Sequence, residues 1–126
     1  MRPTLAQVDA YPVPELLVPR IMKLYKRDKE YAEAILREAK RMLLLRCIRK
    51  HPVTPSVEID DAWHEMILFT RFYQTFCDFL GGGFLHHDPD VETPVEKSSG
   101  EKLYDLTQRW YEEEFKIKPD QKYWTP

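Results

Sequence analysis

Three of the four histidines of this chain lie in two short clusters that also carry carboxylates, D-D-A-W-H-E and H-H-D-P. Asp60 and His64 are four residues apart, a spacing that places both side chains on one face of a helix. His86, His87 and Asp88 follow a run of three glycines. Imidazole and carboxylate groups are suitable ligands for Zn²⁺ and similar ions. The spacing therefore predicts, as one function, a zinc-type site in which His64 and His87 act with Asp60 or Asp88.

The same residues also have ordinary structural interpretations. Asp60 is equally suited to cap a helix by accepting a backbone N–H, and His64 could be a surface histidine or a buried hydrogen-bonding one. Trp63 is expected in the core. Adjacent residues in an extended loop point in opposite directions, so we expect only one of His86 and His87 to reach His64.

A hydrolytic version of the metal site would need an open water position and a general base such as Glu65. On a helical wheel, however, Glu65 lies about 100° from His64, away from a shared pocket. The order of the residues also matches neither H-E-x-x-H nor a Cys/His zinc signature. No complete catalytic constellation is present, and this favours a non-enzymatic protein.

Prolines and glycines divide the chain into helical segments. We expect an irregular N-terminal arm over residues 1–19, helices near 20–27, 29–50 and 59–80, a capping box of Ser98 with Glu101 that begins a helix ending near Phe115, and a packed aromatic tail. No pair of strands is indicated. The predicted fold is therefore all-α: a compact single-domain bundle of about four helices over residues 1–126.

Helical periodicity predicts which faces of the two long helices are buried. In the helix over 29–50, one arc is apolar and the opposite face carries charges that include Arg37, Lys40 and Arg41. Arg46 falls in the apolar arc, so it either extends to solvent or points inward toward an acidic residue at the start of the next helix. The helix over 59–80 is mostly apolar with a narrow polar stripe, which places Arg71 on the face of His64.

The net charge of −2 conceals a strong asymmetry along the chain. Residues 20–50 hold 11 basic and 4 acidic residues, whereas residues 58–126 hold 7 and 15. We interpret this mainly as complementarity between packed halves and as solvated faces. An exposed basic helix over 20–50 would instead offer a patch to an acidic or nucleic-acid partner, with nucleic acid the less favoured of the two.

The compartment is predicted from what the sequence lacks. It has no apolar run of the length that a bilayer requires and no secretory signal pattern. Cys47 and Cys77 are not arranged as C-x-x-C, so reduced thiols are expected. These features indicate a cytoplasmic protein without a membrane span.

The stretch I-D-D-A-W-H-E-M-I-L-F-T-R-F-Y-Q-T-F-C-D-F-L-G-G-G-F-L-H-H-D-P resembles the glycine-rich domain-containing protein-like family, with flanking similarity over residues 21–124. Position by position, the signature of that family falls on the following residues: Asp60, Trp63, His64, Tyr73, Cys77, His87, Asp88, Trp110, Tyr123 and Trp124. Met66 stands where larger members have a second histidine, and their RNA-binding modules are missing. The resemblance implies a helical domain without an assigned reaction.

Two functions follow from these patterns. The first is a non-enzymatic protein-interaction module in which the Asp60/Trp63/His64 and His87/Asp88 elements hold the glycine-turn loop against the central helix. The second is the zinc-type site. The identity of the protein partner is not specified by the sequence.

Overall fold

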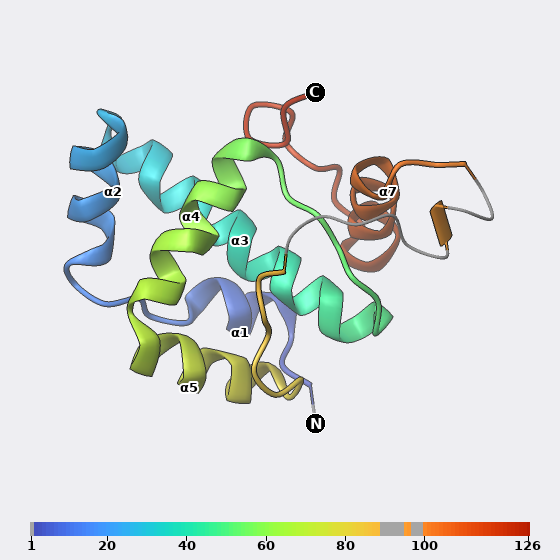
Figure 1. Ribbon diagram of the computed structural model, residues 1–126, viewed down its shortest axis with the longest axis horizontal. Helices are drawn as coiled ribbons and strands as arrows, with labels where there is room; N and C mark the ends of the chain where they lie inside the picture. The colour runs from blue at the N-terminus through green and yellow to red at the C-terminus, as the bar shows by residue number, and fades with distance from the viewer. Residues whose placement is uncertain (1, 89–94, 97–99) are drawn as a thin grey trace.

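The protein is described by a computed structural model that covers residues 2–88, 95–96 and 100–126. Within these residues it contains only helices: α1 (Leu5–Ala10), α2 (Leu17–Tyr25), α3 (Lys29–Arg49), α4 (Val57–Leu68), α5 (Thr70–Leu80) and α7 (Leu103–Phe115). They pack into a helical bundle around α3 (Figure 1). The predicted all-α fold is confirmed, with more and shorter helices than expected.

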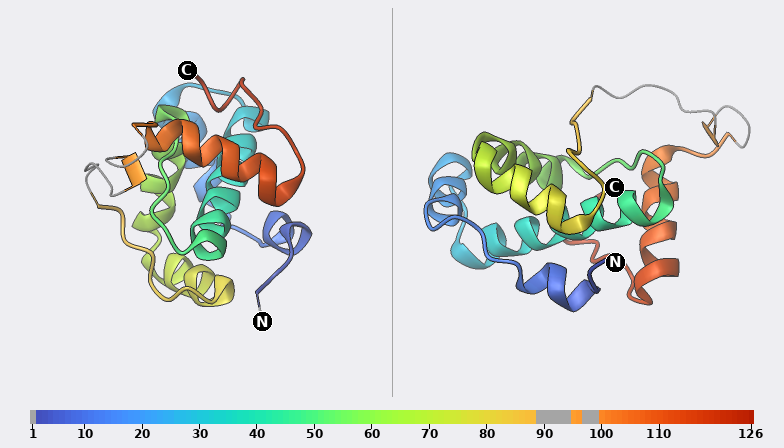
Figure 2. Two further views of the ribbon diagram at one scale, coloured as in Figure 1. Left: turned by 90° about the vertical axis from the view of Figure 1, so that its right-hand side faces the viewer. Right: turned by 90° about the horizontal axis from the view of Figure 1, so that it is seen from below.

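The central helix α3 forms where an uninterrupted run of strong helix formers lies between two caps. The Asp28 carboxylate accepts a hydrogen bond from the Tyr31 amide at 2.8 Å and caps the start. Lys50 ends the helix in the left-handed conformation, with φ 51°. The helix spans the molecule, with α2 at one end and α7 at the other (Figures 1 and 2).

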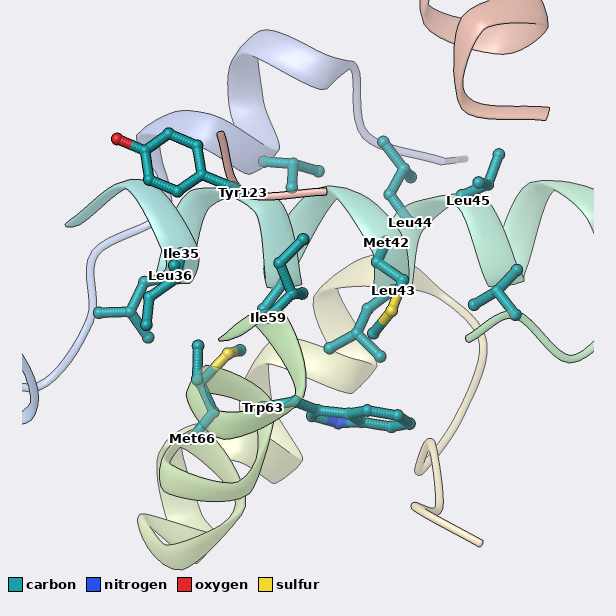
Figure 3. Close-up of a cluster of buried hydrophobic side chains, with 14 of the residues drawn as sticks. Ile35, Leu36, Met42, Leu43, Leu44, Leu45, Ile59, Trp63, Met66 and Tyr123 are labelled. Atoms are coloured by element: carbon teal, nitrogen blue, oxygen red, sulfur yellow. The ribbon is translucent and has the colours of Figure 1, made fainter. Parts of the chain in front are cut away.

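The core lies mainly between α3 and α4. Figure 3 shows Ile59, Trp63 and Met66 of α4 facing the aliphatic side chains of α3, among them Met42 and Leu43. Four of these residues are fully buried, and Trp63 retains only 5% exposure. Burial of side chains of this size contributes about 1.5–3 kcal/mol each, so this contact fixes the orientation of α4.

The predicted continuous helix over 59–80 is wrong, because it is divided at Phe69. This residue has φ −88° and ψ 71°, which lies outside the helical region, and it ends α4 and begins α5. The start also differs from the prediction. Ser56, not Asp60, is the N-cap, and its hydroxyl accepts from the Ile59 amide at 3.2 Å. Asp60 is thereby free of a capping role.

The arm over residues 1–19 is more regular than predicted. Thr4 and Gln7 form a capping box that begins α1, and Val8 is fully buried. This helix covers part of the face of α3 that was predicted to lie away from the core. Lys40 is buried there and donates to the backbone carbonyls of Asp9 and Tyr11 at 3.1 and 2.9 Å.

The residues after α7 return to α3, as predicted for the aromatic tail. Tyr123 and Trp124 are buried, and the Trp124 indole donates to the Glu38 carboxylate at 2.9 Å. Tyr111 of α7 donates to the same carboxylate oxygen at 2.7 Å. Ser98 lies outside the described residues, and the N-cap of α7 is Lys102 without a side-chain capping bond.

Ion pairs join the basic and acidic halves of the chain. Arg20 pairs with Glu65 at 2.6 Å, and Arg49 pairs with Glu113 and Glu114 at 2.8 and 3.1 Å. Part of the charge asymmetry is therefore satisfied internally. Among the helices described, none is long and apolar enough to cross a bilayer.

Candidate metal centre

Helix α4 and the loop after α5 bring three ligand-type side chains together. Asp60 and His64 project from successive turns of α4, with 3.6 Å between Asp60 Oδ2 and His64 Nε2. His87 reaches them from the loop, and its Nε2 lies 2.5 Å from Asp60 Oδ1. The two imidazole rings lie 4.5 Å apart between centroids. One potential ligand atom from each residue falls within 4.8 Å of the other two.

The loop that carries His87 is fixed from both sides. Gly81 ends α5 with φ 84°, a left-handed conformation that favours glycine and turns the chain back toward α4 (Figure 1). Buried Leu85 then makes two bonds, because its carbonyl accepts from the Tyr73 hydroxyl and its amide donates to Cys77 Sγ at 3.5 Å. The position of His87 therefore depends on side chains of α5.

Trp63 forms one wall of the site. Its ring packs on the His87 imidazole at 4.0 Å between centroids, and its indole N–H donates to the Tyr73 hydroxyl at 2.9 Å. The Tyr73 hydroxyl thus links the Trp63 indole of α4 to the Leu85 carbonyl of the loop. Burial raises the pKa of Tyr73 well above its ordinary value of 10, so the hydroxyl keeps its proton as a donor.

The donor set suits a divalent ion of the zinc type. At Zn–N and Zn–O distances of about 2.0–2.2 Å, tetrahedral ligands lie roughly 3.3 Å apart. The 3.6 Å separation of Asp60 Oδ2 and His64 Nε2 is close to this value. His87 Nε2 lies 2.5 Å from the other carboxylate oxygen, Asp60 Oδ1, so this contact would have to open for the two groups to bind one ion. Three protein ligands leave a fourth position for water or a ligand.

A pocket of about 350 Å³ opens beside this triad. Asp60, His87 and Asp88 line one part of it, and Arg46 from α3 lines it as well. The other lining residues are six apolar ones, Pro52, Val53, Pro55, Val57, Trp63 and Leu103, and three polar ones, Thr54, Ser56 and His86. The site thus combines charged groups with an apolar wall, as small-molecule sites do.

A neighbouring carboxylate adds to the negative charge at this turn of α4. The pKa of Asp61 is raised, first by burial and then by the adjacent Asp60 charge.

The structure does not bring every predicted residue into the triad. Asp88 is exposed and lines the pocket, but it is not one of the three clustered ligands. Arg71 is exposed on α5, beyond the break at Phe69, so the helical-wheel argument that placed it on the face of His64 does not hold. His86 packs against the Phe84 ring at 4.8 Å between centroids. Glu65 is buried and paired with Arg20.

Two groups at the site, the Tyr73 hydroxyl and the Arg46 guanidinium in the pocket, were not predicted from the sequence. The position of Tyr73 on an apolar helical face could have indicated a buried hydrogen bond, because a buried phenol normally has a hydrogen-bond partner. Arg46 in an apolar arc was expected either to extend to solvent or to pair with an acid. It is half-buried and lines the same pocket as Asp60.

The resemblance to the glycine-rich domain-containing protein-like family is corrected by comparison with known families. Its pattern rests on a few positions that are explained by local packing, such as Trp63 with Tyr73 and His87. The family model that matches is UCP032817-like, over residues 4–122. No curated protein and no solved structure matched the chain. Because the match covers nearly the whole sequence, the chain belongs to the UCP032817-like family.

Proposed function

We propose that this protein is a helical metal-binding domain that holds a divalent ion of the zinc type with Asp60, His64 and His87. The observation that carries the proposal is the convergence of one ligand atom from each residue within 4.8 Å. Two of the residues come from one helix and the third from a loop 23 positions beyond His64, so their meeting is a product of the fold.

The support around the triad favours binding with little rearrangement. The Tyr73 hydroxyl holds the loop at Leu85, and the Trp63 ring covers one face of the His87 imidazole. Groups that orient a ligand in this way strengthen metal binding, since less ordering is required when the ion arrives.

The proposal concerns binding and not hydrolysis. Glu65, the general base that the sequence offered, is buried in an ion pair with Arg20 at 2.6 Å. That the protein is non-enzymatic therefore remains a prediction from the sequence.

A second candidate function is favoured by the direct contact between Asp60 and His87. Their 2.5 Å hydrogen bond requires no ion, and it joins α4 to the glycine-turn loop. In this alternative the residues form a structural motif in a protein-interaction module. Its protein partner is unidentified, and a nucleic-acid partner at residues 20–50 is the less favoured version.

Zinc titration of untagged protein distinguishes the two functions. We expect one zinc per chain by elemental analysis, and binding at least 10-fold weaker by calorimetry for His64→Ala. His86→Ala is the matched control, because His86 lies in the same loop as His87 but outside the triad. The control should bind zinc as the wild type does.

The opposite results would contradict the proposal. Sub-stoichiometric zinc in the wild type and in His64→Ala alike would leave the structural motif as the function. In that case His87→Ala should lower thermal stability in the absence of any metal, since it removes the bond to Asp60.

A further inference from the structure

Arg46 lines the pocket that opens beside the candidate metal centre. Across the residues that the structure describes, no ion pair or side-chain hydrogen bond is formed by its guanidinium. The other arginines of α3, Arg37, Arg41 and Arg49, all pair with acidic residues. A half-buried cation with unused donors is the natural partner of an oxyanion, because guanidinium binds phosphate and carboxylate through two parallel hydrogen bonds.

The location of Arg46 links it to the candidate metal centre. It lines the pocket together with Asp60 and His87. An oxyanion in this pocket would therefore be near both the Arg46 guanidinium and two of the three proposed metal ligands, Asp60 and His87.

Counting formal charges indicates that such binding depends on the metal. Among the lining residues that the structure describes, and without an ion, the Asp60 and Asp88 carboxylates face the one cation of Arg46, which leaves an excess of negative charge. A divalent ion reverses the sign of this excess. An anion should thus be repelled from the metal-free pocket and attracted to the loaded one.

The remaining surface of the pocket indicates the other part of the ligand. Pro52, Val53, Pro55 and Leu103 present apolar surface, interrupted by the polar side chains of Thr54, Ser56 and His86. The volume of about 350 Å³ is near the lower end of the range for small-molecule sites. The pocket accordingly fits an acid group attached to a small apolar body.

We infer that this pocket binds a small amphipathic oxyanion, either a phosphate monoester or a carboxylate, between Arg46 and a divalent ion held by Asp60, His64 and His87. This inference rests on the proposed metal-binding function and names the class of ligand that it serves. Arg46 supplies the charge and the donors, and the apolar wall receives the body of the ligand.

A second basic pocket provides the control. Arg2, Arg46 and Lys50 line a cavity of about 430 Å³ beside Gly81 and Gly82. Helices α3 and α5 both end there, and the negative ends of their dipoles account for basic side chains at this place. A ligand that bound there would depend on Arg2, whereas a ligand in the first pocket would not.

The test is calorimetric titration of zinc-loaded protein with phenyl phosphate, with benzoate and with uncharged benzyl alcohol. We expect one of the two anions to bind and benzyl alcohol to bind at least 10-fold more weakly. Arg46→Met should weaken binding of the anion by about 10- to 100-fold, the usual effect of removing a charged hydrogen-bonding partner. The affinity for zinc should not change. Arg2→Met is the matched control and should bind the anion as the wild type does.

Each other result overturns a specific statement. Zinc uptake with equal anion affinity in the wild type and Arg46→Met overturns the inference and leaves the metal centre in place. Loss of anion affinity in Arg2→Met would show that the anion binds in the second pocket, and this result also overturns the inference. Anion binding that is as strong without zinc overturns the charge argument. Absence of zinc uptake by the wild type overturns the metal centre itself.

Discussion

The most informative single perturbation of the fold is Tyr73→Phe, because one hydroxyl connects α4, α5 and the loop after α5. Tyr73 is fully buried, and its hydroxyl donates to the Leu85 carbonyl while it accepts from the Trp63 indole at 2.9 Å. The substitution removes one oxygen and leaves the ring in place, so no large cavity forms. It leaves a buried acceptor and a buried donor unpaired.

The expected cost follows from these two unpaired groups. Each costs about 1–3 kcal/mol when its partner is removed. Some relaxation of the loop should offset part of the sum, so we expect the free energy of unfolding to fall by about 2–4 kcal/mol. With a urea m-value of about 1–3 kcal/mol/M, the midpoint should fall by roughly 1–2 M.

Urea unfolding followed by circular dichroism measures this change, with Tyr104→Phe as the control. The Tyr104 hydroxyl also donates to a carbonyl, that of Thr125, but Tyr104 is only partly buried, so its loss should cost about 1 kcal/mol or less. Tyr73→Phe should also weaken zinc binding, since Leu85 precedes His87 by two residues. A free energy of unfolding within about 0.5 kcal/mol of the wild type would refute the assigned role of this hydroxyl.

Two further predictions concern other buried polar groups. Glu38→Ala removes the acceptor shared by Tyr111 and Trp124, and urea unfolding should show that the free energy of unfolding falls by about 3–5 kcal/mol. Glu33→Ala, at an exposed position of the same helix, should change it little. Equal effects of the two substitutions would contradict the role of Glu38 as a shared acceptor. Burial raises the pKa of Tyr73 and of Tyr111 above the ordinary value of 10. The unfolded chain therefore releases these protons at a lower pH than the folded protein does. The contribution of these groups to stability is complete below pH 10 and is lost as the pH rises above it. Unfolding free energies at pH 9 to 11 should therefore fall more steeply in the wild type than in Tyr73→Phe, and equal slopes would be the contrary result.

Local sequence signals predicted the elements whose ends have chemical markers. The helix over 29–50 was predicted almost to the residue, because a run of strong helix formers without glycine or proline is followed by Pro52 and Pro55. The end of α5 was marked by Gly81. In each case the residue types at the boundary satisfy backbone groups locally, without help from distant segments.

The break at Phe69 carries no such marker. The surrounding stretch, M-I-L-F-T-R-F, contains neither glycine nor proline, and its apolar residues extend the helical pattern of both neighbours. Tertiary packing of α4 and α5 decides the conformation there. The same break lies between His64 and Arg71, so a helical wheel drawn for one continuous helix does not describe their relative positions.

Long-range partners were the second kind of information missing from the pattern. Glu38 looked like one charge among many on α3, and nothing nearby in sequence identifies Tyr111 or Trp124 as its partners. Asp60, His64 and His87 were predicted as a group because residue types alone suggest a ligand set. Their actual separation depends on the turn at Gly81 and on the bond between Tyr73 and Leu85.

The bond between the Trp124 indole and Glu38 spans 86 positions of the chain. Ribosomes synthesise α3 long before that indole emerges, so a carboxylate destined for the interior must stay hydrated while most of the bundle is made. The last aromatic residues then exchange that water for their own donors. The Glu38 carboxylate and the Trp124 indole can therefore pair only after the whole span between them has been made.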